Sequence, residues 1–250
     1  MKRVVLFKSE SEDYRRAFSD HDYEVIFVEP LHFTYVNLAE LDEKLNDKGY
    51  TGLIVTSPRA VEAAAQRWTV GKFEVWRARR LYAVGAASAR QARGRLGLDV
   101  RGAAAGSAAA LADLVLAENT DPAKFLFPCG NLSSETLPDM LQSKGISVDS
   151  LTVYETKENE NLREELIKLS ALECSLCCMV FFSPSGCEYI HRQLQTFSNG
   201  LTQLPYFAIG NSTAHKIENL GVEIAGVAEK PTPESITESV QKYFASGASS

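Results

Sequence analysis

Short runs of apolar residues alternate with amphipathic stretches along most of the chain. The runs that predict buried strands are Val4–Phe7, Gly52–Val55, Leu81–Val84, Phe125–Phe127, Met179–Phe182 and Tyr206–Ile209. The stretches that predict helices are Ala60–Gln66, Ser107–Glu118, Glu135–Lys144, Ser185–Gln195, Thr213–Leu220 and Glu234–Phe244. Because strands that alternate with helices form parallel sheets covered on both faces, the pattern predicts an α/β fold.

The same pattern occurs twice in the chain. The similar pairs are LIVTSPRAVEAA at 53–64 with MVFFSPSGCEYI at 179–190, and LYAVGAASARQARGRLGLDV at 81–100 with YFAIGNSTAHKIENLGVEI at 206–224. Pro184 follows Pro58 by 126 residues, and Gly210 follows Gly85 by 125. Two blocks in the same order at nearly the same offset predict two domains of one fold.

A third pair shows how the two domains divide the chain. KRVVLFKSE near the N-terminus is similar to KFLFPCGN at 124–131, so the N-terminal strand belongs with the C-terminal half. The inner domain is then an insertion in the outer one. We predict that domain 1 comprises 1–31 and 159–250, that domain 2 comprises 38–150, and that 32–37 and 151–158 are the strands that cross between them.

Composition excludes several classes of function. The 250 residues carry a net charge of −6, whereas a nucleic-acid-binding domain has a basic surface. No apolar run approaches the ~18 residues that span a bilayer, and the start MKRVVLFKSESEDYRR becomes charged before a signal-peptide core could form. We therefore expect a cytoplasmic protein that binds neither nucleic acid nor membrane.

The five cysteines do not form a disulfide framework, because their number is odd and four of them crowd around one predicted strand. Cys174 and Cys177 have the spacing of a metal-binding or redox pair, but a zinc site needs a second pair of ligands and the sequence shows none. We expect reduced, buried and inert thiols and no metal.

Hydroxyl and amide side chains recur where predicted strands lead into helices. These positions are Ser57-Pro58, Ser183-Pro184, Ser88 after Gly85, Ser212 and Thr213 after Gly210, Asn131, and Thr232-Pro233. Such residues cap helices, and this role alone would explain them. The same edge of a parallel sheet also binds ligands, with helix N-termini that attract anions. The recurrence in both halves favours an acidic ligand in a shared cleft.

The sequence lacks the usual signatures of dinucleotide, ATP, serine-hydrolase and zinc-protease chemistry: it contains no GxGxxG, GxxxxGK[ST], GxSxG or HExxH. His191 falls in a predicted helix and reads as a packing or surface residue. Tyr154 lies in LTVYET at 151–156, the predicted crossing next to the cleft. Its phenol, protonated at neutral pH, could donate to a leaving oxygen, or the ring could simply pack between the domains.

Taken in order, these motifs resemble the uroporphyrinogen-III synthase family, and in particular its animal members. The segments that carry the resemblance are GLIVTSPRAVEAA at 52–64, LFPCGNLSSETLPDMLQSKGI at 126–146, SLTVYETK at 150–157, FFSPSG at 181–186, AIGNSTA at 208–214 and EKPTPESI at 229–236. The resemblance covers essentially the whole chain. It implies two flavodoxin-like domains joined by a two-stranded crossing, which agrees with the insertion inferred above.

The resemblance also implies a reaction. Hydroxymethylbilane, a linear tetrapyrrole with eight carboxylates, loses its terminal hydroxyl as water and closes with ring D inverted to give uroporphyrinogen III in haem synthesis. The family's scheme passes through an azafulvene and a spiro-pyrrolenine. It implies a cyclising carbon–oxygen lyase that needs no metal or coenzyme, and we expect a monomer.

Carried over by motif, the catalytic tyrosine is Tyr154. Substrate contacts carried over in the same way are Thr56, Ser57, Ser88, Ser183, Ser185, Ser212 and Thr213. Members of the family carry threonine where this chain has Ser88 and asparagine where it has Ala86, which removes any amide contact from position 86. The arginines of the segment 79–101 read as a solvated helix face, with carboxylate steering as the alternative.

Two other classes of function remain open from the residues alone. A two-domain binding protein or sensor would hold an acidic ligand in the same cleft without turnover, and an isomerase or lyase could act on another polyacid. The full-length match, including Tyr154, favours the synthase over both.

Overall fold

The computed structural model describes residues 2–119, 122–172, 175–197 and 200–247. They form two compact units: unit 1 comprises Met1–His32 and Lys157–Ser250, and unit 2 comprises Phe33–Thr156. Each unit is an α/β fold on a parallel sheet, which confirms the predicted fold class. Both points of division fall in segments that the sequence assigned to neither domain, so the domain boundaries of the sequence analysis stay a prediction.

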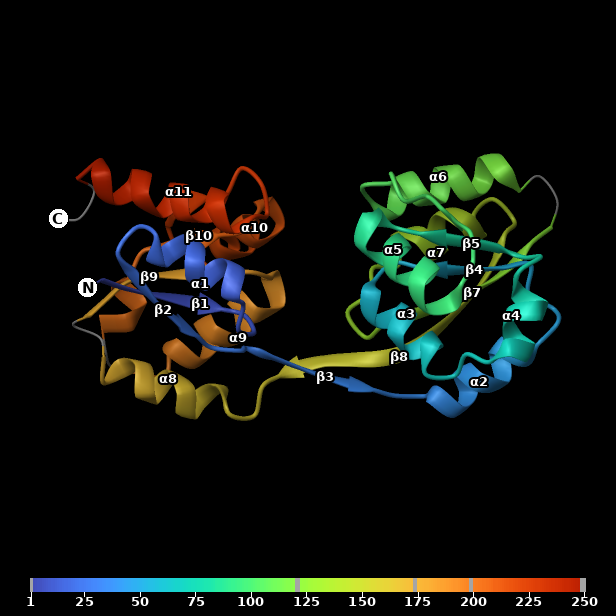
Figure 1. The fold of residues 1–250 in the computed structure, drawn as a ribbon, viewed down its shortest axis with the longest axis horizontal. Coiled ribbons are helices and arrows are strands. Elements are labelled where there is room, and N and C mark those ends of the chain that lie inside the picture. Colours follow the sequence, from blue (N-terminus) through green and yellow to red (C-terminus); the bar gives the residue numbers. More distant parts are fainter. Residues whose placement is uncertain (1, 120–121, 173–174, 198–199, 248–250) are drawn as a thin grey trace. The chain divides into compact units, whose positions relative to one another are not determined.

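Unit 1 holds strands and helices from both ends of the chain (Figure 1). The strands are β1 (Lys2–Phe7), β2 (Tyr23–Phe27), β9 (Leu176–Phe181), β10 (Tyr206–Ala208) and β11 (Ile224–Val227). The helices are α1 (Glu12–Ser19), α8 (Leu162–Ser170), α9 (Pro184–Leu194), α10 (Asn211–Asn219), α11 (Pro233–Ala245) and the 3₁₀ helix η2 (Gly200–Gln203).

Unit 2 is continuous in sequence. Its strands are β4 (Gly52–Val55), β5 (Arg80–Ala83), β6 (Val100–Arg101), β7 (Lys124–Gly130), β8 (Ser147–Glu158) and β3 (Leu31–Tyr35), the last two of which extend across the division. Its helices are α2 (Leu38–Asn46), α3 (Pro58–Ala65), α4 (Val70–Trp76), α5 (Gly85–Leu96), α6 (Ala108–Glu118) and α7 (Thr136–Gln142).

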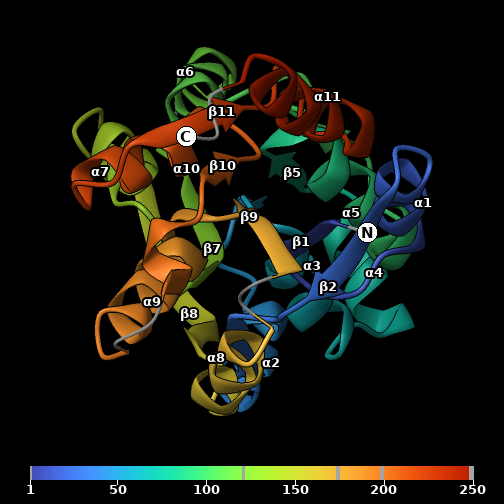
Figure 2. The same cartoon turned by 90° about the vertical axis from the view of Figure 1, so that its left-hand side faces the viewer.

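The sheet of unit 1 has the strand order β11-β10-β9-β1-β2, with parallel pairing throughout. This is the doubly wound order of flavodoxin. Side chains alternate across the sheet, so Val5 and Phe7 pack with α8, α9 and α10, whereas Val4 and Leu6 pack with α1 and α11. Figure 2, in which unit 1 faces the viewer, shows α8 and α9 on one side of this sheet and α1 and α11 on the other.

The sheet of unit 2 has the same arrangement of strands, but the chain forms its strands in a different order along the sequence. Its strand order is β3-β8-β7-β4-β5-β6. The repeats found in the sequence pair β4 with β9, β5 with β10 and β7 with β1, and each pair occupies the same place in its sheet. Three edge strands were not predicted from the sequence, because they are short or only partly buried: β2 and β11 at the edges of the unit 1 sheet and β6 at one edge of the unit 2 sheet.

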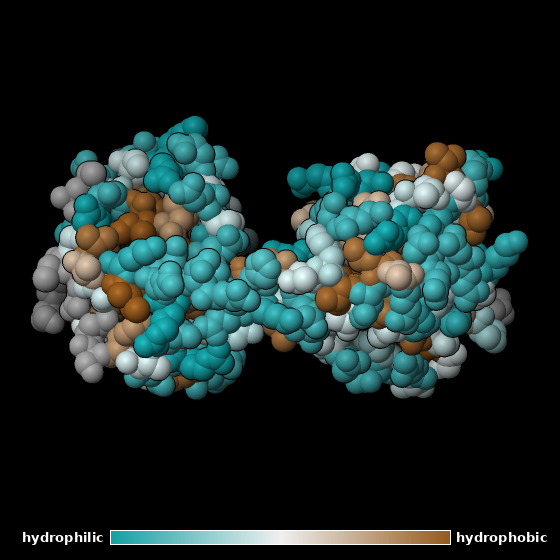
Figure 3. Space-filling model, turned by 90° about the horizontal axis from the view of Figure 1, so that it is seen from below, coloured by the Kyte–Doolittle hydropathy of each residue, from teal (hydrophilic) through white to brown (hydrophobic). Residues whose placement is uncertain are grey.

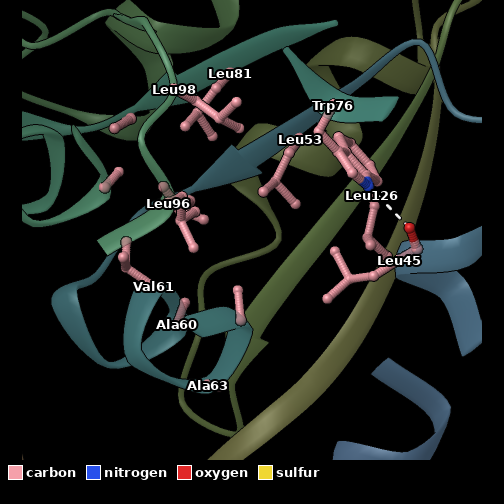
Figure 4. Close-up of a cluster of buried hydrophobic side chains, with 14 of the residues drawn as sticks. Leu45, Leu53, Ala60, Val61, Ala63, Trp76, Leu81, Leu96, Leu98 and Leu126 are labelled. Atoms are coloured by element: carbon pink, nitrogen blue, oxygen red, sulfur yellow. Dashed lines mark hydrogen bonds between the residues drawn. The ribbon is translucent and has the colours of Figure 1, made fainter. Parts of the chain in front are cut away.

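Trp76 belongs to the larger core cluster of unit 2 (Figure 4). Trp76 is 1% exposed, and its indole N–H donates to the Leu45 carbonyl at 2.8 Å. Small residues of α3, among them Ala60 and Ala63, belong to the same cluster, and their size lets the helix approach the sheet closely. This packing holds the start of α3 firmly at the end of β4.

The surface shown in Figure 3 is mostly hydrophilic in both units, with hydrophobic residues in small separate patches. Among the described residues, no helix is both long and apolar enough to cross a membrane.

His191 lies in the last turn of α9 and is the one described residue with a buried side-chain polar atom that lacks a partner. Its Nε2 is 2.8 Å from the Gln195 amide nitrogen, so in the neutral ring Nε2 accepts and the proton is on Nδ1, the unpartnered atom. Burial lowers the pKa of His191 from its usual 6.5.

We expect this histidine to make the protein less stable in acid. Because its pKa is lower in the folded state, the unfolded chain binds the proton first, and stability is lost as the pH falls through 6.5 toward the folded value. The measurement is the free energy of unfolding of the native chain and of His191→Leu between about pH 8 and about pH 5. The native chain should lose more stability than the variant, and parallel curves would contradict the assignment.

Candidate active site

A pocket in unit 2 lies where the chain leaves two neighbouring parallel strands toward opposite edges of the sheet. From β4 the chain continues through α3 to β5, and from its neighbour β7 it continues through α7 to β8 on the other side. Ligands bind at the carboxyl ends of the strands at such a switch point. The pocket there has a volume of about 230 Å³ and is lined by Thr56, Ser57, Ala108, Phe127, Leu132, Ser133, Ser134, Leu137, Tyr154 and Thr156.

Tyr154 and Ser57 are joined by a hydrogen bond in this pocket. The Tyr154 hydroxyl donates to Ser57 Oγ at 3.0 Å, and the same oxygen accepts the Ala60 N–H at 3.1 Å as the N-terminal cap of α3. With two donors pointing at its oxygen, Ser57 directs its own O–H elsewhere. Both proposed roles of Ser57 are therefore compatible, since the capping serine also exposes a hydroxyl in the pocket.

The backbone beside Tyr154 is fixed by Asn131, the first residue after β7. The Asn131 N–H donates to the Tyr154 carbonyl at 3.1 Å. Its side-chain oxygen accepts the Thr156 N–H at 2.8 Å and its amide nitrogen donates to the Thr156 carbonyl at 3.3 Å. These bonds fix the stretch of β8 from Tyr154 to Thr156.

Gly130 makes room for the tyrosine ring. A Cβ at this position would lie 2.5 Å from Tyr154 Cζ and 2.7 Å from the hydroxyl oxygen. Gly130 and Tyr154 are paired between β7 and β8, directly after a register shift between Cys129 and Gly130. The ring therefore packs against a backbone position that has no side chain.

Sequence reasoning took Asn131 as a helix cap, and the structure corrects this. The next helix, α7, begins at Thr136, and the side chain of Asn131 binds the backbone of β8. The lining residues Ser133, Ser134 and Thr156 were also missed. A signal was present, since LSSET follows the strand directly, but only the folded turn shows which hydroxyls face the pocket.

The predicted contacts of unit 1 lie at the starts of α9 and α10. Ser183 caps α9, with its Oγ accepting the Gly186 N–H at 3.1 Å, and Ser185 is half-buried in the first turn. Ser212 is exposed in the first turn of α10.

Two other predicted contacts are nearly inaccessible. Ser88 in α5 and Thr213 in α10 occupy equivalent positions in the repeat, and each is 3% exposed. Such burial favours packing, so a ligand contact from these hydroxyls stays a prediction.

The arginines at 79–101 are mostly engaged with neighbouring groups of unit 2. Arg95 pairs with Glu62 at 2.6 Å, Arg101 pairs with Glu118 at 2.7 Å, and Arg93 donates to the Val100 carbonyl at 3.1 Å. Exposed ion pairs of this kind agree with a solvated helix face.

The cysteines of the described residues are free. Cys129, Cys178 and Cys187 are buried, and burial raises the pKa of Cys187 to about 12, as expected for an inert thiol. Cys177 differs from the expectation, because it is partly exposed and a hydrogen bond with Cys178 lowers its pKa. Cys174 lies outside the described residues.

A larger hollow in unit 1 does not fit an acidic ligand. It measures about 420 Å³ between α1 and α11. Four carboxylates line it, those of Asp13, Asp20, Glu234 and Glu238, and they outnumber its basic residues, Arg16 and His21. These carboxylates would repel an anion. The chemistry of the smaller pocket around Tyr154 makes it the better candidate site.

The fold and the pocket define a class: proteins with two doubly wound α/β units and a hydroxyl-lined pocket at a switch point. Solved structures with the same fold are the uroporphyrinogen III synthase of Thermus thermophilus (mutant form; TM-score 0.67, 16% identity, 98% of this chain and 100% of that chain) and the uroporphyrinogen-III synthetase of Helicobacter pylori (TM-score 0.69, 19% identity, 97% and 99%).

Sequence comparison then identifies the family. The family described as Uroporphyrinogen-III synthase HemD matches residues 12–238. The chain is 30% identical to the uroporphyrinogen-III synthase of Schizosaccharomyces pombe, over 97% of this chain and 98% of that protein. It is 28% identical to the Saccharomyces cerevisiae protein of the same name, over 96% of each. The chain belongs to the uroporphyrinogen-III synthase family.

Proposed function

We propose that this chain converts hydroxymethylbilane to uroporphyrinogen III. Family membership over 12–238 supports the proposal. The observation that carries it is the Tyr154 hydroxyl in the switch-point pocket, held by Gly130 and Asn131 and hydrogen-bonded to Ser57. This arrangement presents a neutral O–H donor to a bound small molecule.

The reaction needs few further groups from the protein. The electron pair of a pyrrole nitrogen expels the terminal hydroxyl as the carbon–oxygen bond breaks. The methylene carbon left behind bonds the substituted α-carbon of ring D, and the bond from that carbon to its original bridge then breaks. The bridge rejoins ring D at its free α-carbon, and the proton lost there balances the departed hydroxide, so the product equals the substrate less one water. A donor that stabilises the departing oxygen lowers the barrier for the first step. In this proposal, Tyr154 is that donor, and Ser57 accepts its hydrogen bond before substrate arrives.

The finer features belong to the same proposal. The net reaction involves no oxidation or reduction, so we propose a carbon–oxygen lyase that works without a cofactor. We propose Thr56 and Ser57 in unit 2 as substrate contacts, and Ser183, Ser185 and Ser212 in unit 1 at the equivalent helix starts. We also propose that the enzyme is cytoplasmic and monomeric and has no nucleic-acid partner. The net charge of −6 supports the absence of a nucleic-acid partner.

The decisive experiment supplies freshly generated hydroxymethylbilane and resolves isomers I and III after oxidation. Hydroxymethylbilane closes spontaneously to isomer I, so an excess of isomer III over a protein-free control is the expected result. Isomer I alone, from protein shown to be folded, would overturn the proposal and favour a protein that binds an acidic ligand without turnover.

A further inference from the structure

Lys8 lies at the point of unit 1 that corresponds to the Tyr154 pocket of unit 2. It follows β1 directly, next to β9, and the chain leaves these two neighbouring strands toward opposite edges of the sheet. The pairing of β1 with β7 and of β9 with β4 makes this the switch point of unit 1. In unit 2 the equivalent point is a pocket, so a ligand-binding role in unit 1 has a structural precedent within the same chain.

Three aromatic rings surround the Lys8 ammonium. Its Nζ lies 4.5 Å from the ring centre of Tyr14, 5.6 Å from that of Phe182 and 5.8 Å from that of Phe27. The rings come from α1, from the turn after β9 and from β2. Phe182 is also the residue before Ser183, a proposed substrate contact.

The charge of Lys8 is not neutralised by a direct ion pair. Its recorded hydrogen bond goes to the Ser9 carbonyl at 3.0 Å, and among the described residues no carboxylate oxygen lies within 4.0 Å of Nζ. Arg15 makes a useful comparison, because it shares the Phe27 ring but pairs with Glu10 at 3.4 Å and Glu12 at 3.8 Å.

Two effects act on the Lys8 ammonium: the three rings attract it, and its partial burial removes water from it. Burial lowers the pKa of Lys8, and the more distant charges of Asp13 and Glu29 only partly oppose this. Packing alone does not require the charge, since an apolar side chain would fill the space between the rings without desolvating a cation. Ionisable groups whose pKa is shifted by burial are found more often at functional sites.

We propose that Lys8 is a substrate-binding residue whose ammonium, fixed by the rings of Tyr14, Phe27 and Phe182, binds a carboxylate of the acidic ligand. The rings hold the long side chain in one place, so little conformational freedom is lost on binding. Of the three N–H donors of the ammonium, two do not take part in the hydrogen bond to Ser9. The inference rests on the proposed function, and it adds a positive charge to a set of proposed substrate contacts that are all hydroxyls.

The first test compares Lys8→Met with Lys124→Met. Lys124 is a matched control, because its Nζ also lies 4.5 Å from an aromatic ring, that of Tyr50, but at the amino end of β7. Losing a charged hydrogen bond should raise KM for hydroxymethylbilane about tenfold in Lys8→Met, with a smaller effect on kcat. Lys124→Met should keep the native KM, and Lys8→Arg should recover part of the loss.

The second test needs neither turnover nor a variant. The native protein is acetylated at limiting reagent with and without uroporphyrin I, a stable octacarboxylate, and the rate at each lysine is read by mass spectrometry. Lys8 should be protected by uroporphyrin I and Lys124 should not.

The outcomes separate this inference from the proposed function. The inference would be overturned if Lys8→Met forms isomer III with the native KM and uroporphyrin I does not protect Lys8. The proposed function would remain intact. Protection of Lys8 by uroporphyrin I in a protein that yields only isomer I would support the carboxylate site and overturn the function.

Discussion

Tyr154→Phe is expected to lower kcat for isomer III by about 10²-fold, the usual contribution of one proton donor to catalysis. The substitution removes only the hydroxyl, while the ring keeps its place against Gly130 and the backbone keeps its bonds to Asn131. The fold should therefore be unchanged, and the loss should fall on kcat more than on KM.

Tyr82→Phe is the matched control for this measurement. The Tyr82 hydroxyl also hydrogen-bonds within unit 2, to Glu118 at 2.8 Å, but Tyr82 is not among the residues that line the pocket. It should lose stability and keep the native kcat at a temperature where both proteins are folded. Native isomer III formation by Tyr154→Phe would remove the hydroxyl from the mechanism without touching the function.

Gly130→Ala is expected to cause a loss of the same order, about 10²-fold, for a steric reason. The added Cβ would meet the tyrosine ring at 2.5 Å, closer than real side chains approach. The contact is with the outer end of a side chain, so the ring can swing away and the fold survives. The hydroxyl then leaves its position beside Ser57, and its contribution to catalysis is lost.

A double-mutant cycle tests this explanation directly. If Gly130→Ala acts by displacing the Tyr154 hydroxyl, adding Tyr154→Phe should cause almost no further loss, because the two changes remove the same interaction. Gly94→Ala, at an exposed helical position with nothing within 4 Å of the new Cβ, should keep native activity. Additive losses in the double mutant would show that Gly130 acts through something other than Tyr154.

The sequence could predict the parts of this molecule that repeat. Buried strands such as Gly52–Val55 and helix starts such as Ser57-Pro58 follow from local rules, since apolar runs, capping hydroxyls and proline act within one turn of chain. The structure has β4 at Gly52–Val55 and begins α3 at Pro58, with Ser57 as its cap. The internal repeat then extended these local predictions to a two-unit fold.

Other features depend on contacts between distant segments and could not be read locally. Asn131 looked like a cap because its neighbours resemble a helix start, yet its partners are on β8, 25 residues away. Ser88 looked like an exposed helix-start hydroxyl, but the helix turns it inward. Lys8 belongs to no recognisable motif. Its proposed binding role depends on three rings that only the folded sheet brings together.

The equivalent strand orders of the two sheets have a consequence for how the chain is built. Counted along the sequence, β1, β2, β4, β5 and β6 correspond in order to β7, β8, β9, β10 and β11, so the chain is a tandem duplication. Each copy gives its first two strands to one sheet and its last three to the other, which is domain swapping between two halves of a single polypeptide. Unit 2 is complete once Thr156 has left the ribosome, whereas β1 must wait for β9, whose paired residues lie more than 170 positions later. Unit 1, which carries Lys8, is therefore the part of the protein whose folding depends on segments that are synthesised after unit 2.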